Sequence, residues 1–147
     1  MSQDPETQSP EASETTSQMN TKGPARVLLA EDDRAVRRYL QVILERAGYE
    51  VICAGDGLEA MKIALAEPLD AVITDAIMPH LTGQELCRFL RSYPALATLP
   101  VILLSAFENN TAPAETEAVA NVCLVKPVKP EELTAQLARL ISENSGA

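Results

Sequence analysis

Residues 71–79, AVITDAIMP, determine how we interpret the rest of the chain. The apolar and β-branched side chains that open this stretch follow one another without polar alternation and lead directly to an acid, Asp75. A short uninterrupted run of this kind is typical of a strand that is buried on both faces. Because a buried strand ends on a charge only where that charge has a partner or a use, Asp75 is the first candidate for a functional residue.

Four further segments have the same character and alternate with helical patterns. They are RVLLA at 26–30, EVICA at 50–54, VILLS at 101–105 and VCLVK at 122–126. Apolar side chains recur at helical spacing in residues 36–47, 58–66 and 83–92 and again after Pro130. Another helix is expected within residues 109–121, NNTAPAETEAVAN, and it must be short because Pro113 is tolerated only near a helix start.

Strands and helices that alternate in this way predict an α/β fold. Its five-stranded parallel sheet is expected to be covered by helices on both faces, because continuous apolar strands need burial on both sides. Ligands of such folds bind in the crevice at the carboxyl ends of the strands. Function is therefore expected at the last residue of each strand and just beyond it.

Composition divides the chain into two parts. Residues 1–24 are mostly Ser, Thr, Gln, Glu and Pro and are expected to form a disordered, acidic and polar tail, because they cannot bury enough surface to offset the entropy of ordering. Residues 25–145 are expected to form one domain. The chain of 147 residues is 46% hydrophobic, which is enough for a single sizeable core.

The net charge of -9 restricts the partners. Nucleic acid and anionic membranes would repel the protein at range, so another protein or a cation is the expected partner. No apolar run approaches the length of a membrane span and the N-terminus lacks a signal-peptide pattern, so a cytoplasmic protein is expected. Cys53, Cys87 and Cys123 have no CxxC spacing and are expected to be reduced, small apolar side chains.

Four of the predicted strands end in groups that can take part in chemistry. Glu31 and Asp32 follow the first strand, and Asp75, Ser105 and Lys126 end the third, fourth and fifth. Two carboxylates about 4 Å apart repel by roughly 4 kcal/mol at an effective dielectric constant of about 20. A hard cation such as Mg²⁺ removes that cost and also neutralises an incoming phosphoryl group. With Lys126 as a second positive charge and Ser105 as a hydrogen-bond donor, Asp75 can act as a nucleophile that forms an acyl phosphate.

The motifs that contain these groups occur in a fixed order. They are VLLAEDD at 27–33, ITDAIMPHLTG at 73–83, VILLSA at 101–106 and LVKP at 124–127. Together they resemble the receiver domain of two-component response regulators, the CheY-like family, over residues 26–143. The resemblance implies a flavodoxin-like fold with strand order 2-1-3-4-5, Mg²⁺ as cofactor, and a histidine kinase or histidine phosphotransfer protein as partner.

By this resemblance, Asp75 is the phosphoacceptor and Glu31 with Asp32 is the acidic pair that recruits Mg²⁺. The main-chain carbonyl of Ile77 is a further expected metal ligand. Lys126 resembles the active-site lysine of the family. Each role follows from the position of the residue within the motif that carries it.

The switch region of the chain departs from the family pattern. Ser105 resembles the switch hydroxyl, and a cis peptide is expected between Lys126 and Pro127. The family usually carries Tyr or Phe three residues before the lysine, where this chain has Cys123. The usual inward movement of a ring at that position is therefore not available, and Phe107 is either a substitute ring or a loop-packing side chain.

Ile77 and Phe107 also bear on the lifetime of the phosphorylated form. In receivers, the side chains two residues beyond the phosphoacceptor and two beyond the switch hydroxyl flank the route of the hydrolytic water. Both are apolar in this chain, so they can exclude a water but cannot orient one. We expect an acyl phosphate that persists for minutes or longer.

The sequence as a whole predicts a stand-alone receiver that is not an enzyme beyond its own phosphorylation and dephosphorylation. Only SENSGA follows the last helical pattern, so output is expected through a downstream protein target, with a homodimer also possible. Two alternatives stay open: a pseudo-receiver that binds partners without phosphate, and a Mg²⁺-dependent phosphatase with an aspartyl nucleophile. Such phosphatases generally carry a second aspartate where this chain has Ile77.

Overall fold

A computed structural model describes residues 23–106 and 120–145 of the chain. The tail predicted for residues 1–24 falls almost entirely outside these ranges, and so does most of the helix predicted within residues 109–121. The elements given below are those of the described residues.

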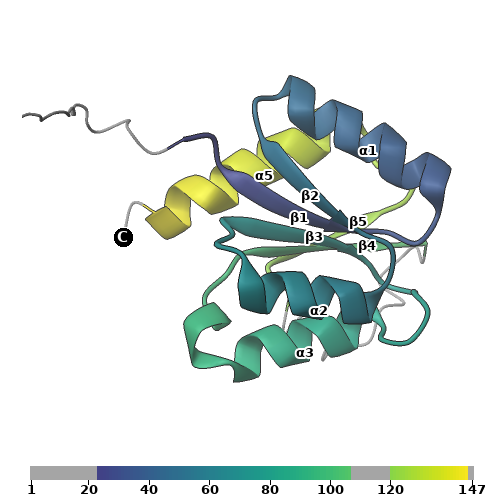
Figure 1. The fold of residues 1–147 in the computed structure, drawn as a ribbon. Helices are drawn as coiled ribbons and strands as arrows, with labels where there is room; N and C mark the ends of the chain where they lie inside the picture. Colours follow the sequence, from purple (N-terminus) through teal and green to yellow (C-terminus); the bar gives the residue numbers. More distant parts are fainter. Residues whose placement is uncertain (1–22, 107–119, 146–147) are drawn as a thin grey trace, which may run out of the picture.

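Five short strands form one parallel sheet, as the apolar runs predict (Figure 1). They are β1 (Arg26–Ala30), β2 (Glu50–Ala54), β3 (Ala71–Asp75), β4 (Val101–Ser105) and β5 (Val122–Val125). The strand order is β2-β1-β3-β4-β5, which confirms the predicted flavodoxin-like arrangement. Every residue of β3 and β4 is buried, because these strands lie inside the sheet and are covered on both faces. The run that ends on Asp75 is thus part of the centre of the sheet.

The described ranges contain four α-helices. They are α1 (Arg34–Arg46), α2 (Gly57–Ala66), α3 (Gly83–Ser92) and α5 (Pro130–Ser145), and a short 3₁₀ helix, η3 (Pro94–Leu96), follows α3. Asp33, Asp56 and Thr82 each accept a hydrogen bond from a main-chain amide of the first turn of their helix. Gly48, with φ of 101°, provides the left-handed residue that ends α1.

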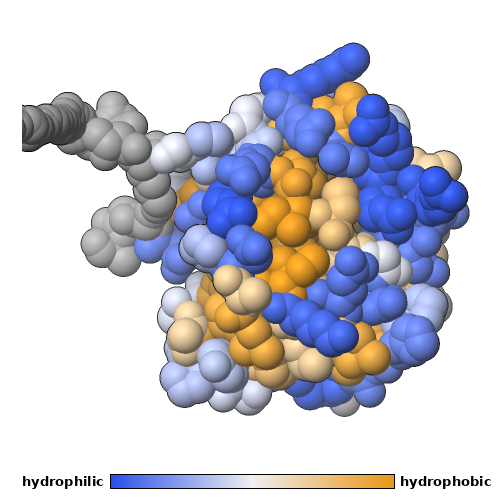
Figure 2. Space-filling model, viewed as in Figure 1, coloured by the Kyte–Doolittle hydropathy of each residue, from blue (hydrophilic) through white to orange (hydrophobic). Residues whose placement is uncertain are grey.

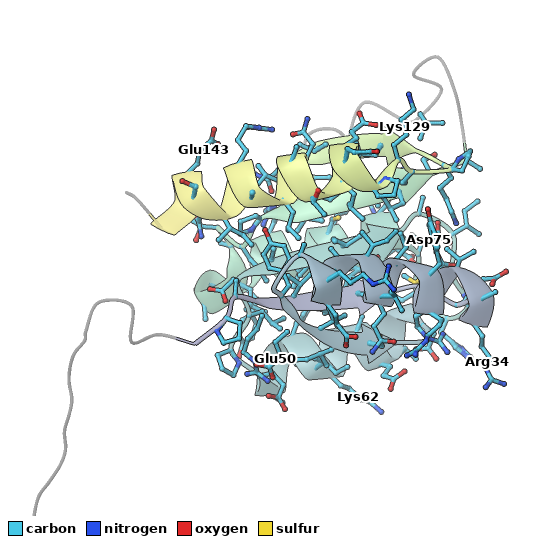
Figure 3. The ribbon with its side chains drawn as sticks, turned by 90° about the horizontal axis from the view of Figure 1, so that it is seen from above. Arg34, Glu50, Lys62, Asp75, Lys129 and Glu143 are labelled. Atoms are coloured by element: carbon cyan, nitrogen blue, oxygen red, sulfur yellow. The ribbon has the colours of Figure 1, made fainter. Side chains whose placement is uncertain are left out.

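The sheet separates two apolar cores. Because successive side chains of a strand point to opposite faces, Leu28 lies in the core beneath α2 and α3, whereas Leu29 lies in the core beneath α1 and α5 (Figure 1). Seen from above, α1 and α5 lie side by side over one face of the sheet (Figure 3). The edge strand β2 is only half-buried, and Figure 2 shows apolar surface between the polar outer faces of α1 and α2.

Two glycines allow the loop after β3 to fold tightly at the carboxyl edge of the sheet. A Cβ on Gly83 would collide with the main-chain oxygen of Asp75, and a Cβ on Gly57 would collide with that of Leu81. The amide of Gly83 donates a hydrogen bond to the carbonyl of Ala76 at 2.9 Å. The close approach of α2 and α3 to this loop therefore fixes the main chain around Asp75.

Candidate functional site

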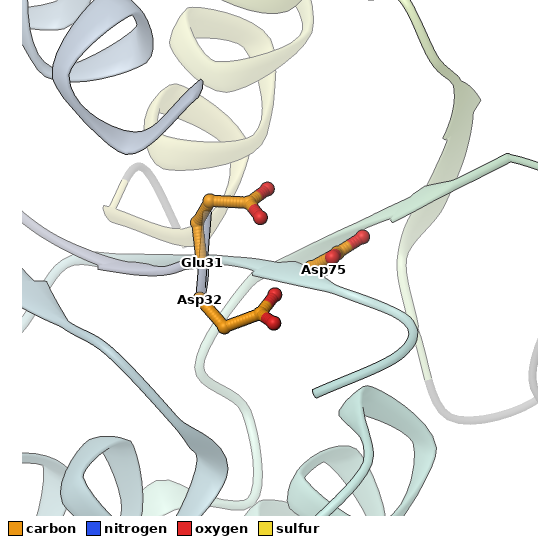
Figure 4. Close-up of side chains that lie close together, drawn as sticks. All are labelled: Glu31, Asp32 and Asp75. Carbon is orange, nitrogen blue, oxygen red and sulfur yellow. The ribbon is translucent and has the colours of Figure 1, made fainter. Parts of the chain in front are cut away.

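Three carboxylates meet at the carboxyl edge of the sheet (Figure 4). Glu31 and Asp32 follow β1, and Asp75 is the last residue of β3. One oxygen from each carboxylate lies within 4.8 Å of the others. Glu31 is 1% exposed and Asp75 is 8% exposed, whereas Asp32 is open to solvent. Glu31 and Asp32 are more than forty positions from Asp75 in the sequence, but the three acids form one cluster in space.

Lys126 supplies the counter-charge of this cluster. Its Nζ lies 3.3 Å from Oε1 of Glu31 and 3.2 Å from Oδ1 of Asp75. The main-chain amide of Lys126 donates to the carbonyl of Ser105 at 2.8 Å, and the peptide between Lys126 and Pro127 is cis, as expected. Burial alone lowers the pKa of the Lys126 ammonium, but the carboxylates of Asp75 and Glu31 outweigh it and raise that pKa above 10.5.

Glu31 is the member of the acidic cluster whose charged form is disfavoured by burial. Burial is the main reason that its pKa lies above the ordinary value of 4.5, and the charge of Asp75 raises it further. The amide of Asp33, which donates to Oε2 of Glu31 at 3.1 Å, and the ammonium of Lys126 act in the opposite direction. One ammonium is thus shared by two buried carboxylates, so it offsets the cost of burying the charge of Glu31 only in part.

Glu31→Gln is expected to stabilise the metal-free protein at neutral pH, by on the order of 1 kcal/mol. The raised pKa of Glu31 contributes stability that is complete below 4.5 and is lost as the pH rises through the pKa of the folded state. Urea unfolding in EDTA should therefore show the wild type gaining stability as the pH falls from neutral, and the variant gaining less. Glu143→Gln, at an exposed glutamate of α5, is the control. A variant less stable than wild type at neutral pH would contradict the expectation.

The other residues predicted to form the site take different positions around this cluster. Ser105 ends β4, is 4% exposed, and lies on the strand next to Asp75. The side chain of Ile77 is 63% exposed in the loop just after Asp75. Cys123 pairs with Leu103 in the sheet and packs, partly buried, against the core beneath α2 and α3. Phe107 lies outside the described residues, so its predicted roles remain predictions.

A family model of the response regulator receiver domain matches residues 27–138. The chain belongs to this family. The receiver domain is a signalling module of two-component response regulators. The family and the fold predicted from the motifs are therefore confirmed.

Similar proteins are bacterial regulators and receivers. Response regulator MprA of Mycobacterium sp. (strain KMS) is 40% identical over 123 residues, which cover 83% of this receiver and 53% of MprA. The chain therefore spans about half the length of the curated relatives it matches. A putative response regulator from Chloroflexus aurantiacus J-10-fl has a TM-score of 0.77 and 35% identity, and the match covers 81% of this chain and 98% of that one.

A second similar structure holds a metal. The receiver domain of a sensor histidine kinase from Pseudomonas aeruginosa PAO1 has a magnesium ion coordinated in its active-site cleft. Its TM-score to this receiver is 0.76, with 28% identity and coverage of 82% of this chain and 99% of that one.

In the part of this chain that the structure describes, no helix has the length and apolar character needed to cross a membrane.

Sequence reasoning missed two features of this receiver. Arg37, on α1, donates from Nη1 to the main-chain oxygen of Glu31 at 2.7 Å. An apolar hollow of about 310 Å³ lies between α1 and the loop that joins β5 to α5, beside Lys126, and Val36, Tyr39 and Val128 are among its lining residues. The apolar residues of α1 are visible in the sequence, but the side on which the helix leaves them uncovered depends on how it packs.

Proposed function

We propose that this receiver accepts a phosphoryl group on Asp75 from a histidine kinase or a histidine phosphotransfer protein, and that it signals through protein contacts. The observation that carries the proposal is the position of Asp75, which is buried among two further carboxylates and the Lys126 ammonium at the carboxyl edge of the sheet. An aspartate with only a structural role would not need to be buried beside two other carboxylates and an ammonium. We also propose residues 25–145 as the receiver domain and residues 1–24 as a tail.

In the proposed reaction, a carboxylate oxygen of Asp75 attacks the phosphorus atom. A new P–O bond forms, the P–N bond of the phosphohistidine breaks, and the histidine leaves with its electron pair and takes up a proton. Oδ1 of Asp75 already accepts from the amide of Ala76 at 3.0 Å and lies 3.2 Å from Lys126 Nζ. Both contacts hold the carboxylate in one orientation, which favours Oδ2 as the attacking atom.

The donor set of the acidic cluster fits Mg²⁺. The carboxylates of Asp32 and Asp75 and the main-chain carbonyl of Ile77 would hold the ion, with Glu31 as the further acid beside it. When bound, Mg²⁺ neutralises the carboxylates and the negative charge of the incoming phosphoryl group. The receiver of Pseudomonas aeruginosa with its coordinated magnesium ion supports this assignment.

Lys126 and Ser105 are proposed to contact the phosphoryl group after transfer. Lys126 already lies at hydrogen-bonding distance from Asp75, so a short movement brings its ammonium to a phosphoryl oxygen. The main-chain amide of Lys126 donates to the carbonyl of Ser105, so a movement of one residue towards the phosphoryl group can also move the other. Cys123 provides no ring for the switch, so the change is proposed to be transmitted through β4 and β5 themselves.

The proposed function is tested by incubating the protein with acetyl phosphate and Mg²⁺ and measuring its intact mass. We expect the addition of one phosphoryl group, which EDTA prevents because the acidic cluster then stays uncompensated. Release of many equivalents of inorganic phosphate per protein would instead favour the phosphatase. No added mass from acetyl phosphate or from a panel of phosphorylated kinases would favour the pseudo-receiver and overturn the proposal.

A further inference from the structure

Arg37 connects α1 to the backbone of the acidic cluster. It lies one turn into α1, where its side chain is half-buried, and its guanidinium reaches back over the loop that joins β1 to α1. Nη1 donates to the main-chain oxygen of Glu31 at 2.7 Å, which is a short, charge-assisted hydrogen bond. The same nitrogen would lie 3.5 Å from a Cβ built on Gly55, so the guanidinium also covers the loop after β2.

This contact completes the hydrogen bonding of Glu31 where the sheet ends. The amide of Glu31 still donates to the carbonyl of Ala54 on β2 at 3.0 Å, but the ladder goes no further. The carbonyl of Glu31 belongs to the peptide that joins it to Asp32, and Arg37 holds that carbonyl. The main chain between the two acids is therefore fixed on one side by β2 and on the other by α1.

We propose that Arg37 is a positioning residue for the metal-binding acids, an inference that rests on the proposed function. By fixing the peptide between Glu31 and Asp32, the guanidinium sets the direction in which the exposed carboxylate of Asp32 leaves the main chain. Without that bond, Asp32 samples other directions and meets Asp75 at metal-binding distance for a smaller fraction of the time. Arg37 acts through the main chain and does not touch the ion.

Positioning and simple electrostatics predict opposite results when Arg37 loses its charge. A positive charge near the acidic cluster repels a divalent cation, so its removal alone should strengthen Mg²⁺ binding. Loss of positioning should weaken it, because residues that orient metal ligands typically contribute about tenfold or more to affinity. The sign of the change in Mg²⁺ affinity therefore separates the two explanations.

The test compares Arg37→Met with Arg38→Met. Methionine keeps the unbranched stem and the helix propensity of arginine but has no donor and no charge. Arg38 is the next residue of α1 and is exposed. Arg38→Met therefore removes the same charge but leaves the hydrogen bond from Arg37 to Glu31 intact. Isothermal titration with MgCl₂ is expected to give a Kd about tenfold higher for Arg37→Met than for wild type. Arg38→Met should match wild type or bind slightly more tightly.

Stability and affinity are measured on the same samples. Urea unfolding in EDTA reports any loss of folded protein, and the titration is made at a temperature where each variant is folded. If Arg37→Met does not fold, Arg37→Gln replaces it. The side-chain amide of glutamine is two bonds shorter than the guanidinium of arginine and does not reach the carbonyl of Glu31, so weaker Mg²⁺ binding is again expected. Unchanged or tighter binding in either folded variant overturns the positioning role. Absence of Mg²⁺ binding by the wild type would instead overturn the proposed metal site.

Discussion

Asp75→Asn is expected to abolish the uptake of a phosphoryl group from acetyl phosphate. Asparagine has nearly the same shape and keeps a carbonyl oxygen that can accept from the amide of Ala76, so the loop after β3 should be preserved. Its amide is not a nucleophile at neutral pH, and no acyl phosphate can form on it. Intact mass after incubation with Mg²⁺ should show wild type with one added phosphoryl group and the variant with none.

Asp56→Asn is the matched control for this experiment. Asp56 also lies at the carboxyl edge of the sheet, where its side chain caps α2 by accepting from the amide of Glu59 at 2.8 Å. Asparagine caps a helix about as well as aspartate, so the control should fold and accept the phosphoryl group like wild type. Phosphoryl uptake that persists in Asp75→Asn, on Asp32 for example, would show that the wrong carboxylate has been assigned.

The sheet could be predicted closely because its strands are continuous apolar runs. Buried parallel strands need apolar side chains on both faces, so a run such as residues 101–105 has no competing helical or half-exposed pattern. The 3₁₀ helix η3, by contrast, was not predicted. Its sequence, PAL, carries no periodic signal, and it forms where the chain turns from α3 towards β4.

Within the site, the sequence identifies which acids meet but treats Glu31 and Asp32 as equivalent. In the structure Glu31 is buried against Lys126, and Asp32 is exposed, because neighbouring residues at a strand end point in opposite directions. The bond from Arg37 to Glu31 could not be predicted either. It depends on where Asp33 starts α1 and on the path of a long side chain across the loop, and neither leaves a sequence motif.

We expect the lifetime of the phosphorylated form to depend on Ile77. Its side chain is 63% exposed in the loop that follows Asp75, so it is not packed into the core and is free to cover the mouth of the site. An apolar side chain there can shield the acyl phosphate but cannot bind or deprotonate a water. Wild-type protein, phosphorylated with acetyl phosphate and then freed of the donor, is expected to lose the group over minutes or longer with Mg²⁺ present.

Ile77→Glu is expected to shorten that lifetime by about 10²-fold, the lower end of what a positioned general base contributes. The new carboxylate can orient a water and accept its proton as the water attacks the phosphorus atom, and the loop has room for it because the site of Ile77 is exposed. The decay of the phosphorylated form, followed by intact mass, measures the effect. Ile77→Val keeps an apolar side chain and should decay at the wild-type rate. Loss of the group within seconds from the wild type, or an unchanged rate in Ile77→Glu, would show that water reaches the acyl phosphate by a route that Ile77 does not control.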